Sequence, residues 1–361
     1  MKILVINPGS TSTKIAVYED ETTLFMESVE HDLETLQAYP GIYDQYGMRA
    51  GVVGEALRQG GFKGADFSAV VARGGLLPRA RAGAYLVTPE LLDTLRHRPQ
   101  NEHISNIGAA LAQSLAEPFG LRAYIYDPVT VDELEPIARV TGFKEMERRG
   151  QGHNLNMRAA AIKKARELGR PYDEVTSIVV HMGGGITMSL HHQGRIIDMI
   201  SDDEGSFSPE RAGGLPGFQL IALATGGQYD YQSLMRKYTR QGGLMSHFGT
   251  TDARAVLKMM EGGDRRAALV LEAMCHNVAR NVAKLAVAVR GRVEHIVITG
   301  GLAHCRLFCD WIGERVGFIA PVTVIPGENE MEALALGALR VLRGEEEARE
   351  YHWEAPAGYS V

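Results

Sequence analysis

The stretch ILVINPGSTSTKIAVY, residues 3–18, joins an apolar run, a turn of small polar residues and a second run of alternating polarity. This pattern predicts two strands connected by a tight turn. The stretch SIVVHMGGGITMSL, residues 177–190, repeats the same order with three glycines in the turn. Laid over each other at a constant offset of 174, the stretches pair Val5 with Val179, Gly9 with Gly183 and Thr13 with Thr187. A duplicated domain is the simplest explanation of this repeat.

Outside the repeats, each half supplies further strands and helices in a similar order. Buried strands are expected at residues 69–72 and 122–126, and again at 295–299 and 322–325. This order predicts an α/β fold in which a mixed sheet flanked by helices is built twice, with a ligand site in the cleft between the halves. The long apolar-striped helix expected at residues 265–289 fits either a core or an interface.

Two domains follow from the repeat and from the chain length. We expect an N-terminal domain at residues 1–150, which carries the carboxylate and phosphate side, and a nucleotide-binding C-terminal domain at residues 151–342. The apolar helix expected at residues 331–342 is a candidate to cross back onto the first domain, and a C-terminal helix at about residues 343–361 is likewise expected to pack back on it.

Composition and charge exclude several classes of partner. The 361 residues are 45% hydrophobic and 23% charged, as in a globular protein. A formal charge of -6 gives no basic patch, so we expect neither nucleic acid nor a membrane surface as partner. The sequence predicts no signal peptide and no membrane span. Three cysteines without CxxC spacing indicate ordinary buried thiols and a reducing cytoplasm: Cys275, Cys305 and Cys309.

The first turn, Asn7–Lys14, is a candidate phosphate site. Small side chains allow the backbone amides and the hydroxyls of Ser10 and Ser12 to approach a phosphate closely, and Lys14 adds a point charge. The string lacks the second glycine of a Walker A loop. A surface hairpin rich in Ser and Thr is the alternative interpretation of this string alone.

The second turn places Gly183, Gly184 and Gly185 directly after His181 and Met182. Three consecutive glycines cost conformational entropy, which predicts a positive φ or a close approach of another group. His181 is a candidate hydrogen-bond donor to a transferred phosphoryl group, although a histidine with a purely structural role at a strand end is also compatible.

Two further charged residues follow predicted strands of the first half. Arg73 is followed by two glycines, and its planar guanidinium matches a carboxylate or a phosphate. Asp127 ends the strand at 122–126 and, with Asp132 and Glu133 close by in sequence, is a candidate for water-mediated Mg²⁺ binding. A turn-forming role for this aspartate is the alternative.

Six motifs, taken in order, resemble the acetate and butyrate kinase family, and their residues are more similar to those of butyrate kinases than to those of acetate kinases. They are NPGSTSTK, RGG, DPVTVDE, HMGGG, TGGLA and PGENEMEALALGAL, which span residues 7–339. The resemblance implies duplicated actin-like (ribonuclease H-like) domains and an ATP- and Mg²⁺-dependent phosphorylation of a short-chain fatty acid, best butyrate, to an acyl phosphate and ADP. It also implies a homodimer or higher homo-oligomer.

Within this family, the resemblance assigns roles to matching residues. Asn7 and Lys14 contact phosphate, and Arg73 holds the substrate carboxylate. Asp127 is the catalytic acidic residue and also a metal residue, and Glu330 helps to bind magnesium. A second group comprises the transition-state histidine His153 and the residues at the adenosine site, Gly300, Gly301 and Leu302.

The chain departs from the acetate kinase pattern at three places. Gly184 stands where those enzymes carry Asn, Gly152 replaces an aromatic residue, and residues 215–218 replace an Arg-Ser-Gly-Asp stretch. Our hypothesis is that the nearby Arg211 supplies the missing charge. The alternatives are a branched-chain or other short carboxylic acid kinase, a sugar or polyol kinase with the same fold, and a non-transferring actin-like ATPase.

Overall fold

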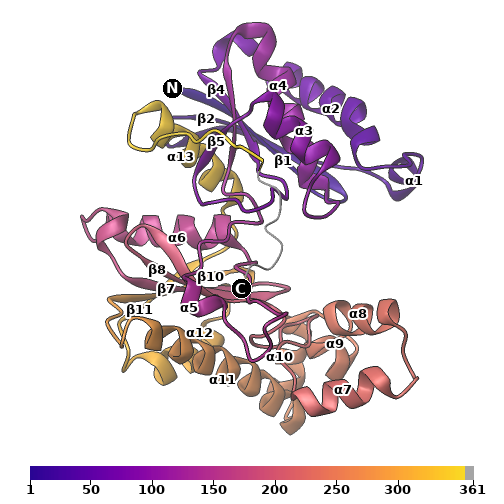
Figure 1. Cartoon of the computed structure of the whole chain (residues 1–361), viewed down its shortest axis with the longest axis vertical. Coiled ribbons are helices and arrows are strands. Elements are labelled where there is room, and N and C mark those ends of the chain that lie inside the picture. The colour runs from indigo at the N-terminus through magenta and orange to yellow at the C-terminus, as the bar shows by residue number, and fades with distance from the viewer. Residues whose placement is uncertain (354–361) are drawn as a thin grey trace. The chain divides into compact units, whose positions relative to one another are not determined.

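The computed structural model describes residues 1–353, which form two compact units, each with its own sheet and hydrophobic core (Figure 1). The first unit comprises Met1–Asp132 together with the segment that begins at Asn329, and the second comprises Glu133–Glu328. The expected boundary at residue 150 therefore differs from the observed one. The reason is local pairing, since the amide of Asp132 donates to Ala80 whereas that of Glu135 donates to Ile197 in the second unit.

The first unit contains a six-stranded mixed sheet with the order β3-β2-β1-β4-β6-β5. The strands are β1 Lys2–Pro8, β2 Ser12–Glu19, β3 Thr22–Glu30, β4 Ala69–Arg73, β5 Ala84–Leu86 and β6 Arg122–Tyr126. Strands β1, β2 and β3 pair antiparallel, while β4 and β6 run parallel to β1. The carboxyl ends of β1, β4 and β6 therefore lie at one edge of the sheet.

Helices cover both faces of this sheet. They are α1 Leu33–Gln37, α2 Tyr46–Gln59, α3 Pro89–His97, α4 Gly108–Ala116 and α13 Glu330–Leu342. Figure 1 shows α13 on the opposite side of the sheet from α2 and α4. A glycine at position 337 permits this packing, because a Cβ there would lie 2.6 Å from the ring of Tyr126.

The end of the chain differs from the expected helix at residues 343–361. Helix α13 ends at Leu342, and the segment after it contains a turn and then a single bridge from Arg349 to Tyr85 of β5. Residues 354–361 of the predicted helix lie outside the described residues. The helix that returns to the first unit is α13, as expected for residues 331–342, although the expected domain bounds had placed these residues in the second domain.

The second unit repeats the topology of the first with a five-stranded sheet in the order β11-β10-β7-β8-β9. Its strands are β7 Ser177–Met182, β8 Ile186–His192, β9 Arg195–Ile200, β10 His295–Gly300 and β11 Val322–Pro326. As in the first unit, three antiparallel strands are followed by two strands parallel to the first of them. The predicted duplication is confirmed at the level of strand order and direction.

The helices of the second unit include the long one predicted at 265–289. They are α5 Pro136–Arg139, α6 Asn154–Glu167, α7 Gly217–Thr225, α8 Tyr231–Arg240, α9 Gly243–Phe248, α10 Ala253–Glu261, α11 Arg265–Ala288 and α12 Arg306–Val316. Asp264 caps α11 by accepting from the amides of Arg266 and Ala267. Leu271, Met274 and Val278 are fully buried in the second core, so one face of this helix belongs to the core.

The two hairpins differ in the length of their turns. In the first, Gly9 donates to the carbonyl of Ser12, which leaves Ser10 and Thr11 at the tip. In the second, Gly183 donates to the carbonyl of Gly185, so Gly184 alone forms the tip. The constant offset of 174 therefore holds in β1 and β7 but not beyond the turn, where the second copy is one residue shorter.

This shorter turn changes which residues are equivalent. Asn7 pairs with Lys14 across the first hairpin, and His181 pairs with Thr187 across the second. Asn7 therefore corresponds to His181, and Lys14, rather than Thr13, corresponds to Thr187.

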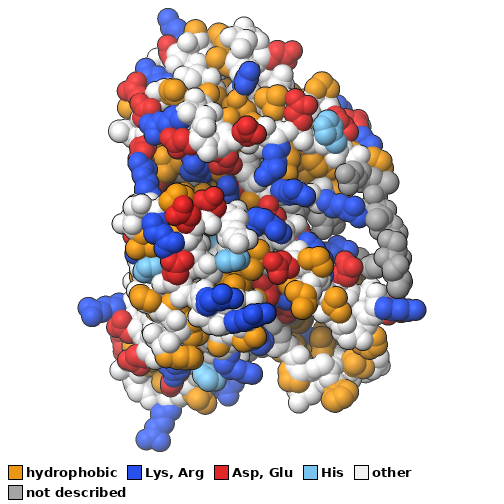
Figure 2. Space-filling model, turned by 60° about the vertical axis from the view of Figure 1, so that its left-hand side comes forward, with side chains coloured by type: hydrophobic (Ala, Val, Ile, Leu, Met, Phe, Trp, Pro, Cys, Tyr) orange, Lys and Arg blue, Asp and Glu red, His pale blue; other side chains and the backbone are white. Residues whose placement is uncertain are grey.

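Acidic and basic side chains are mixed over the face of the molecule shown in Figure 2. Among residues 1–353, no helix combines the length and apolar character needed to cross a membrane.

Candidate active site

In the first unit, three of the predicted residues meet at the carboxyl ends of β1 and β4. Arg73 Nη1 lies 2.8 Å from Glu330 Oε1, and Asn7 Nδ2 donates to Glu330 Oε2 at 2.7 Å. Glu330 is the first residue of α13, which brings it next to strands that precede it by more than 250 residues. Both Arg73 and Glu330 remain partly exposed, so the pair is open to an anion or a cation from solution.

The first turn lies beside this group. Lys14 is exposed and sits directly opposite Asn7, so both side chains project from the same face of the sheet. Ser10 is exposed at the tip and Ser12 is half-buried. The structure therefore places Asn7, Lys14, Arg73 and Glu330 in one group.

The side-chain oxygen of Asn7 is a further feature of this group. The residue is only 4% exposed, and its Oδ1 has no hydrogen-bond partner within residues 1–353. A buried acceptor without a partner is costly, which favours a ligand that binds it. Because Mg²⁺ prefers oxygen ligands and takes only one or two from protein when phosphates supply the others, this oxygen and the Glu330 carboxylate fit that ion.

Asp127 lies at the end of β6 in a less open environment. Its carboxylate is 2% exposed and accepts from the amide of Gly83 at 2.7 Å, and its backbone has a φ of 40°. Glu133, expected near it, belongs to the second unit, where its carboxylate accepts from the amide of Ile196. Among the described residues, no group of three or more His, Cys, Asp or Glu side chains is arranged to hold a metal.

The two glycines after Arg73 have an internal role. A Cβ at Gly74 would lie 2.7 Å from Pro128, and one at Gly75 would lie 2.8 Å from the backbone of Asn106. The absence of side chains at Gly74 and Gly75 allows the chain after β4 to pack directly against Pro128 and Asn106. This packing holds the end of β4 and Arg73 in place.

In the second unit, two histidines stack on each other. The rings of His153 and His181 are 3.8 Å apart at an interplanar angle of 9°. Asn156 on α6 donates its amide to Nδ1 of His181 at 2.9 Å, which places the proton of a neutral imidazole on Nε2. That Nε2 forms no hydrogen bond within residues 1–353, although Glu328 Oε1 lies 3.4 Å away. Thr187 is 2.9 Å from Nδ1 of His153 and fixes the second ring.

The glycine turn of the second unit has a different explanation from the one expected. None of Gly183, Gly184 and Gly185 has a positive φ. Instead, a Cβ at Gly185 would lie 2.8 Å from Nη1 of Arg211. Gly185 therefore clears space for a guanidinium, and of the two predicted reasons only close approach is confirmed.

Arg211 is held at this turn by several contacts. Its guanidinium forms an ion pair with Asp202, and its amide donates to Ser208 Oγ, which itself donates to the carbonyl of Gly184 at 2.6 Å. Burial lowers the pKa of Arg211 from its usual value, but an arginine stays charged at neutral pH. The structure thus places the guanidinium of Arg211 at the second glycine-rich turn, and the hypothesis that it supplies the charge missing from residues 215–218 stays a prediction.

The predicted adenosine-site residues follow β10. Gly300 has a φ of 91°, and a Cβ there would lie 2.4 Å from the carbonyl of Met182, so only glycine fits. A Cβ at Gly301 would meet nothing within 4 Å. Leu302 is half-buried against the second core. At the end of β10, the space beside Gly300 is thus filled by the backbone of Met182, whereas the space beside Gly301 is unoccupied by protein atoms.

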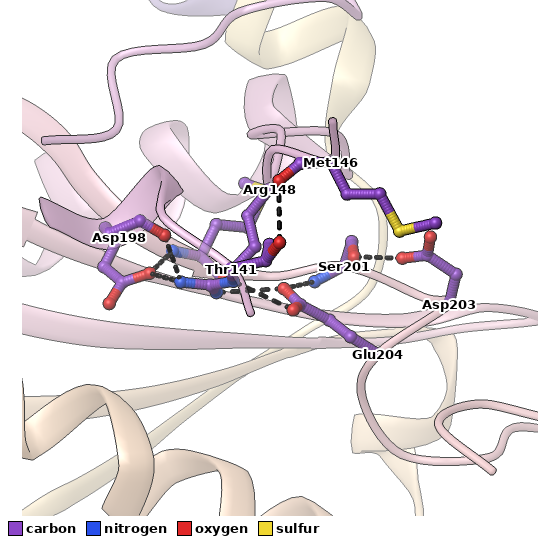
Figure 3. A network of polar contacts seen from close by, with 9 residues as sticks. Thr141, Met146, Arg148, Asp198, Ser201, Asp203 and Glu204 are labelled. Carbon is purple, nitrogen blue, oxygen red and sulfur yellow. Dashed lines mark hydrogen bonds and ion pairs between the residues drawn. The ribbon is translucent and has the colours of Figure 1, made fainter. Parts of the chain in front are cut away.

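A network of polar contacts anchors the chain that leads to His153 (Figure 3). Arg148 lies between Asp198 of β9 and Glu204, at 3.0 and 2.9 Å, and also donates to the carbonyl of Met199. Hydrogen bonds and charge from Glu204 and Asp198 keep the pKa of Arg148 above its usual value. The network fixes residues 141–148 on β9 and thereby positions the segment that precedes His153.

Several residues of these groups were missed by sequence reasoning. Asn156 lies three residues after His153 in QGHNLN, and Thr187 follows from the hairpin register, so both had a local signal. Asp202 lies in a loop nine residues before its partner Arg211, where no periodic pattern pairs two residues, and Glu328, although inside the motif PGENEMEALALGAL, lies far in sequence from His181. His103 also belongs to this set, since burial and then the charge of Arg73 lower its pKa.

Comparisons with known proteins place this architecture. The acetate kinase of Porphyromonas gingivalis has the same fold, with a TM-score of 0.80 at 17% identity, over 94% of this chain and 99% of that chain. This likeness shows the predicted fold class, an α/β architecture in which a mixed sheet flanked by helices is built twice. The chain is 43% identical to probable butyrate kinase 2 of Caldanaerobacter subterraneus and 44% identical to butyrate kinase 2 of Clostridium acetobutylicum, each over 97% of this chain and 99% of the relative.

The match to a sequence family agrees with these relatives. Residues 144–309 match the acetokinase family. With relatives above 40% identity along nearly the whole chain, the protein belongs to the acetokinase family and is a phosphotransferase. The resemblance predicted from six motifs is confirmed.

Proposed function

We propose that the protein phosphorylates butyrate with ATP, in a reversible reaction that gives butanoyl phosphate and ADP. The observation that carries this proposal is the identity of 43–44% over 97% of the chain with proteins named butyrate kinases. The arrangement of charged residues at the two hairpins supplies the groups that such a reaction needs.

In the first unit, we assign Arg73 to the binding of the butyrate carboxylate. Its guanidinium can form two parallel hydrogen bonds with a carboxylate, and the pair with Glu330 holds it in place. Asn7, Lys14, Ser10 and Ser12 bind the phosphoryl group that is transferred.

Magnesium is assigned to Glu330, with Asp127 as the second predicted metal residue. When bound, the ion neutralises charge on the phosphates of the nucleotide. The unpartnered oxygen of Asn7 next to Glu330 supports this location. The contact of Asp127 with Gly83 favours an electrostatic role for this aspartate over direct coordination.

In the second unit, we assign the nucleotide phosphates to the turn at Gly183, Gly184 and Gly185, and the adenosine to Gly300, Gly301 and Leu302. His181 donates through Nε2 to a phosphate oxygen, because its tautomer is fixed by Asn156. His153 and Arg211 stabilise the phosphoryl group in flight.

The chemistry requires little beyond position and charge. A carboxylate is ionised at neutral pH and is already a nucleophile, so no general base is needed. The donors then act on the three equatorial oxygens as charge develops. A sugar or polyol kinase needs a base beside a hydroxyl, and the open Arg73 favours the acid kinase over that alternative.

The test is ATP-dependent acyl phosphate formation with acids of two to six carbons, trapped as hydroxamates. Since each methylene in an apolar pocket is worth about 1–3 kcal/mol, butyrate should exceed acetate while neighbours such as isobutyrate are also used. Equal turnover of acetate and butyrate would contradict the assigned substrate. ATP hydrolysis without acyl phosphate would favour the non-transferring ATPase.

A homo-oligomer and a cytoplasmic location stay predictions. Helix α7 has an apolar sequence, yet none of its residues is buried, and Phe218 is 92% exposed. Exposed apolar surface of this kind is typical of a protein contact. Light scattering of the purified protein measures its assembly directly.

A further inference from the structure

A buried arginine lies behind the turn of the first hairpin. Arg49, on α2, is 0% exposed. Its five N–H groups are all used: Nε and Nη2 donate to Gln45 Oε1 at 3.1 and 3.0 Å, and Nη1 donates to the carbonyl of Ser12 and to Thr13 Oγ1 at 2.9 and 3.0 Å. The remaining bond runs from Nη2 to the carbonyl of Ser10 at 3.3 Å.

All of these partners are neutral. Within residues 1–353, no carboxylate forms an ion pair or hydrogen bond with Arg49. A buried charge without a counter-ion is costly. Attaching α2 to the hairpin does not require an unbalanced charge, because an arginine paired with a carboxylate could do the same. The absence of a counter-ion for Arg49 therefore needs its own explanation.

The contacts of Arg49 determine which way the turn's backbone groups point. The carbonyls of Ser10 and Ser12 both face the guanidinium, and the carbonyl of Thr11 accepts from the amide of His31 at 2.7 Å. In a trans peptide the N–H points opposite to the C=O, and the described chain has no cis peptide. The Thr11 amide is therefore directed away from Arg49.

The amides of Ser10 and Thr11 are available to a ligand. Within the described residues, the N–H groups of Ser10 and Thr11 donate no hydrogen bond to the protein, and both residues are exposed. Successive free amides in a turn bind anions, and phosphate groups above all. Asn7, which leads into this turn, contributes the buried unpartnered oxygen described above.

We propose that Arg49 is a positioning residue for phosphoryl transfer, which turns the carbonyls of Ser10 and Ser12 inward and supplies a buried positive charge behind the phosphate-binding amides. The role of Arg49 in phosphoryl transfer rests on the proposed function. The binding of an anion at Ser10 and Thr11 is independent of that function.

The experiment has a binding arm and a kinetic arm. With selective ¹⁵N-Ser and ¹⁵N-Thr labelling, the amide resonances of Ser10 and Thr11 are followed as inorganic phosphate is added to the wild type, to Arg49→Lys and to Arg49→Met. Arg58→Lys, at the exposed end of the same helix, is the matched control. Lysine keeps the charge but cannot make five directed hydrogen bonds.

The expected result is a phosphate-dependent shift of both amides in the wild type and in Arg58→Lys, which is lost in both Arg49 variants. In the kinetic arm, Arg49→Lys should lower kcat for acyl phosphate formation about tenfold and change the KM for butyrate by less than about twofold, because the turn acts on the phosphoryl group in flight.

Two outcomes overturn the proposal. One is a wild type whose Ser10 and Thr11 amides do not respond to phosphate, a result that stands even if the Arg49 variants fail to fold. The other is a folded Arg49→Lys protein with normal kcat and normal shifts. If the wild type shows the shifts but forms no acyl phosphate, the proposed reaction fails while the anion site survives.

Discussion

The two hairpins of the molecule have the same topology but present different chemistry. The first has an exposed tip of Ser10 and Thr11 and is supported from behind by the buried Arg49. The second has a single glycine at its tip, and the guanidinium of Arg211 lies against it. The two units thus share the strand scaffold but not the source of positive charge. In the first unit the charge comes from Arg49 behind the turn, and in the second it comes from Arg211 against the turn itself.

The equivalent residues that precede the two turns, Asn7 and His181, also differ in their chemistry. Asn7 offers a buried acceptor, whereas His181 offers a buried donor through Nε2. An acceptor suits a metal ion and a donor suits a phosphate oxygen. The comparison predicts that the two hairpins bind different partners in the reaction, and each substitution below alters the residues of one unit while leaving the other unit intact.

The largest effect is expected when the donor of the second hairpin is removed. The double variant His181→Phe, Asn156→Leu keeps a ring to stack on His153 and leaves no amide without its acceptor. We expect kcat to fall roughly a hundredfold, as for the loss of one donor to developing charge. Hydroxamate formation and a thermal melt measure activity and folding together.

Asn156→Leu alone is the control for this variant. It removes the group that fixes the tautomer but keeps the imidazole, so the loss of activity should be smaller. If the double variant turned over within about threefold of the wild type, His181 would have no contact with the reacting phosphate.

A smaller but still large effect is expected in the first unit. Arg73→Ala removes the fork proposed to hold the carboxylate and should lower kcat by more than about tenfold. Arg58→Ala changes an exposed arginine of the same unit and should be neutral. Near-normal butyrate kinase activity of Arg73→Ala would remove this residue from the site.

The glycines of the two turns provide a matched pair with an intermediate effect. A Cβ at Gly185 would meet the guanidinium of Arg211 at 2.8 Å, whereas one at Gly9 would lie 3.3 Å from Ser12 Oγ. Gly185→Ala should therefore displace Arg211 and lower kcat several-fold, roughly 3- to 10-fold, while Gly9→Ala should stay within about twofold. Similar losses in both variants would mean that the second turn does not depend on Arg211.

Much of this comparison could be predicted from local sequence. Both hairpins, the strand that ends at Arg73 and the duplication follow from apolar runs interrupted by small residues, which are short-range patterns. The residues at strand ends were predicted for the same reason. Asn7, Lys14, His181 and the glycines occupy the places that the pattern assigned to them.

The remainder depended on contacts between distant segments. The sequence cannot specify that Glu330 pairs with Arg73 or that the chain changes units at residue 133. The one-residue difference between the turns was missed because glycines carry no pattern that fixes register. Arg49 was missed because an arginine within a helix usually lies at the surface.

The smallest effect concerns stability at acid pH and again distinguishes the two hairpins. His191 on β8 corresponds to Tyr18 on β2, since the two residues pair with Ser177 and Ile3. Burial, with a smaller contribution from the charge of Arg158, lowers the pKa of His191 to about 3. The raised pKa of the buried Tyr18 keeps that side chain neutral throughout the acid range.

The sign of the effect follows from proton linkage. Because the folded-state pKa of His191 lies below the unfolded value of about 6.5, the unfolded chain binds the proton first, and stability present above pH 6.5 is lost as the pH falls toward 3. The loss is about 1.4 kcal/mol per pH unit while only the unfolded form is protonated. Amide protection factors measured by hydrogen exchange at pH 7, 6 and 5 should therefore fall in β7 and β8 before β1 and β2. His191→Gln should remove this difference, and equal loss of protection in both hairpins of the wild type would show that His191 does not control it.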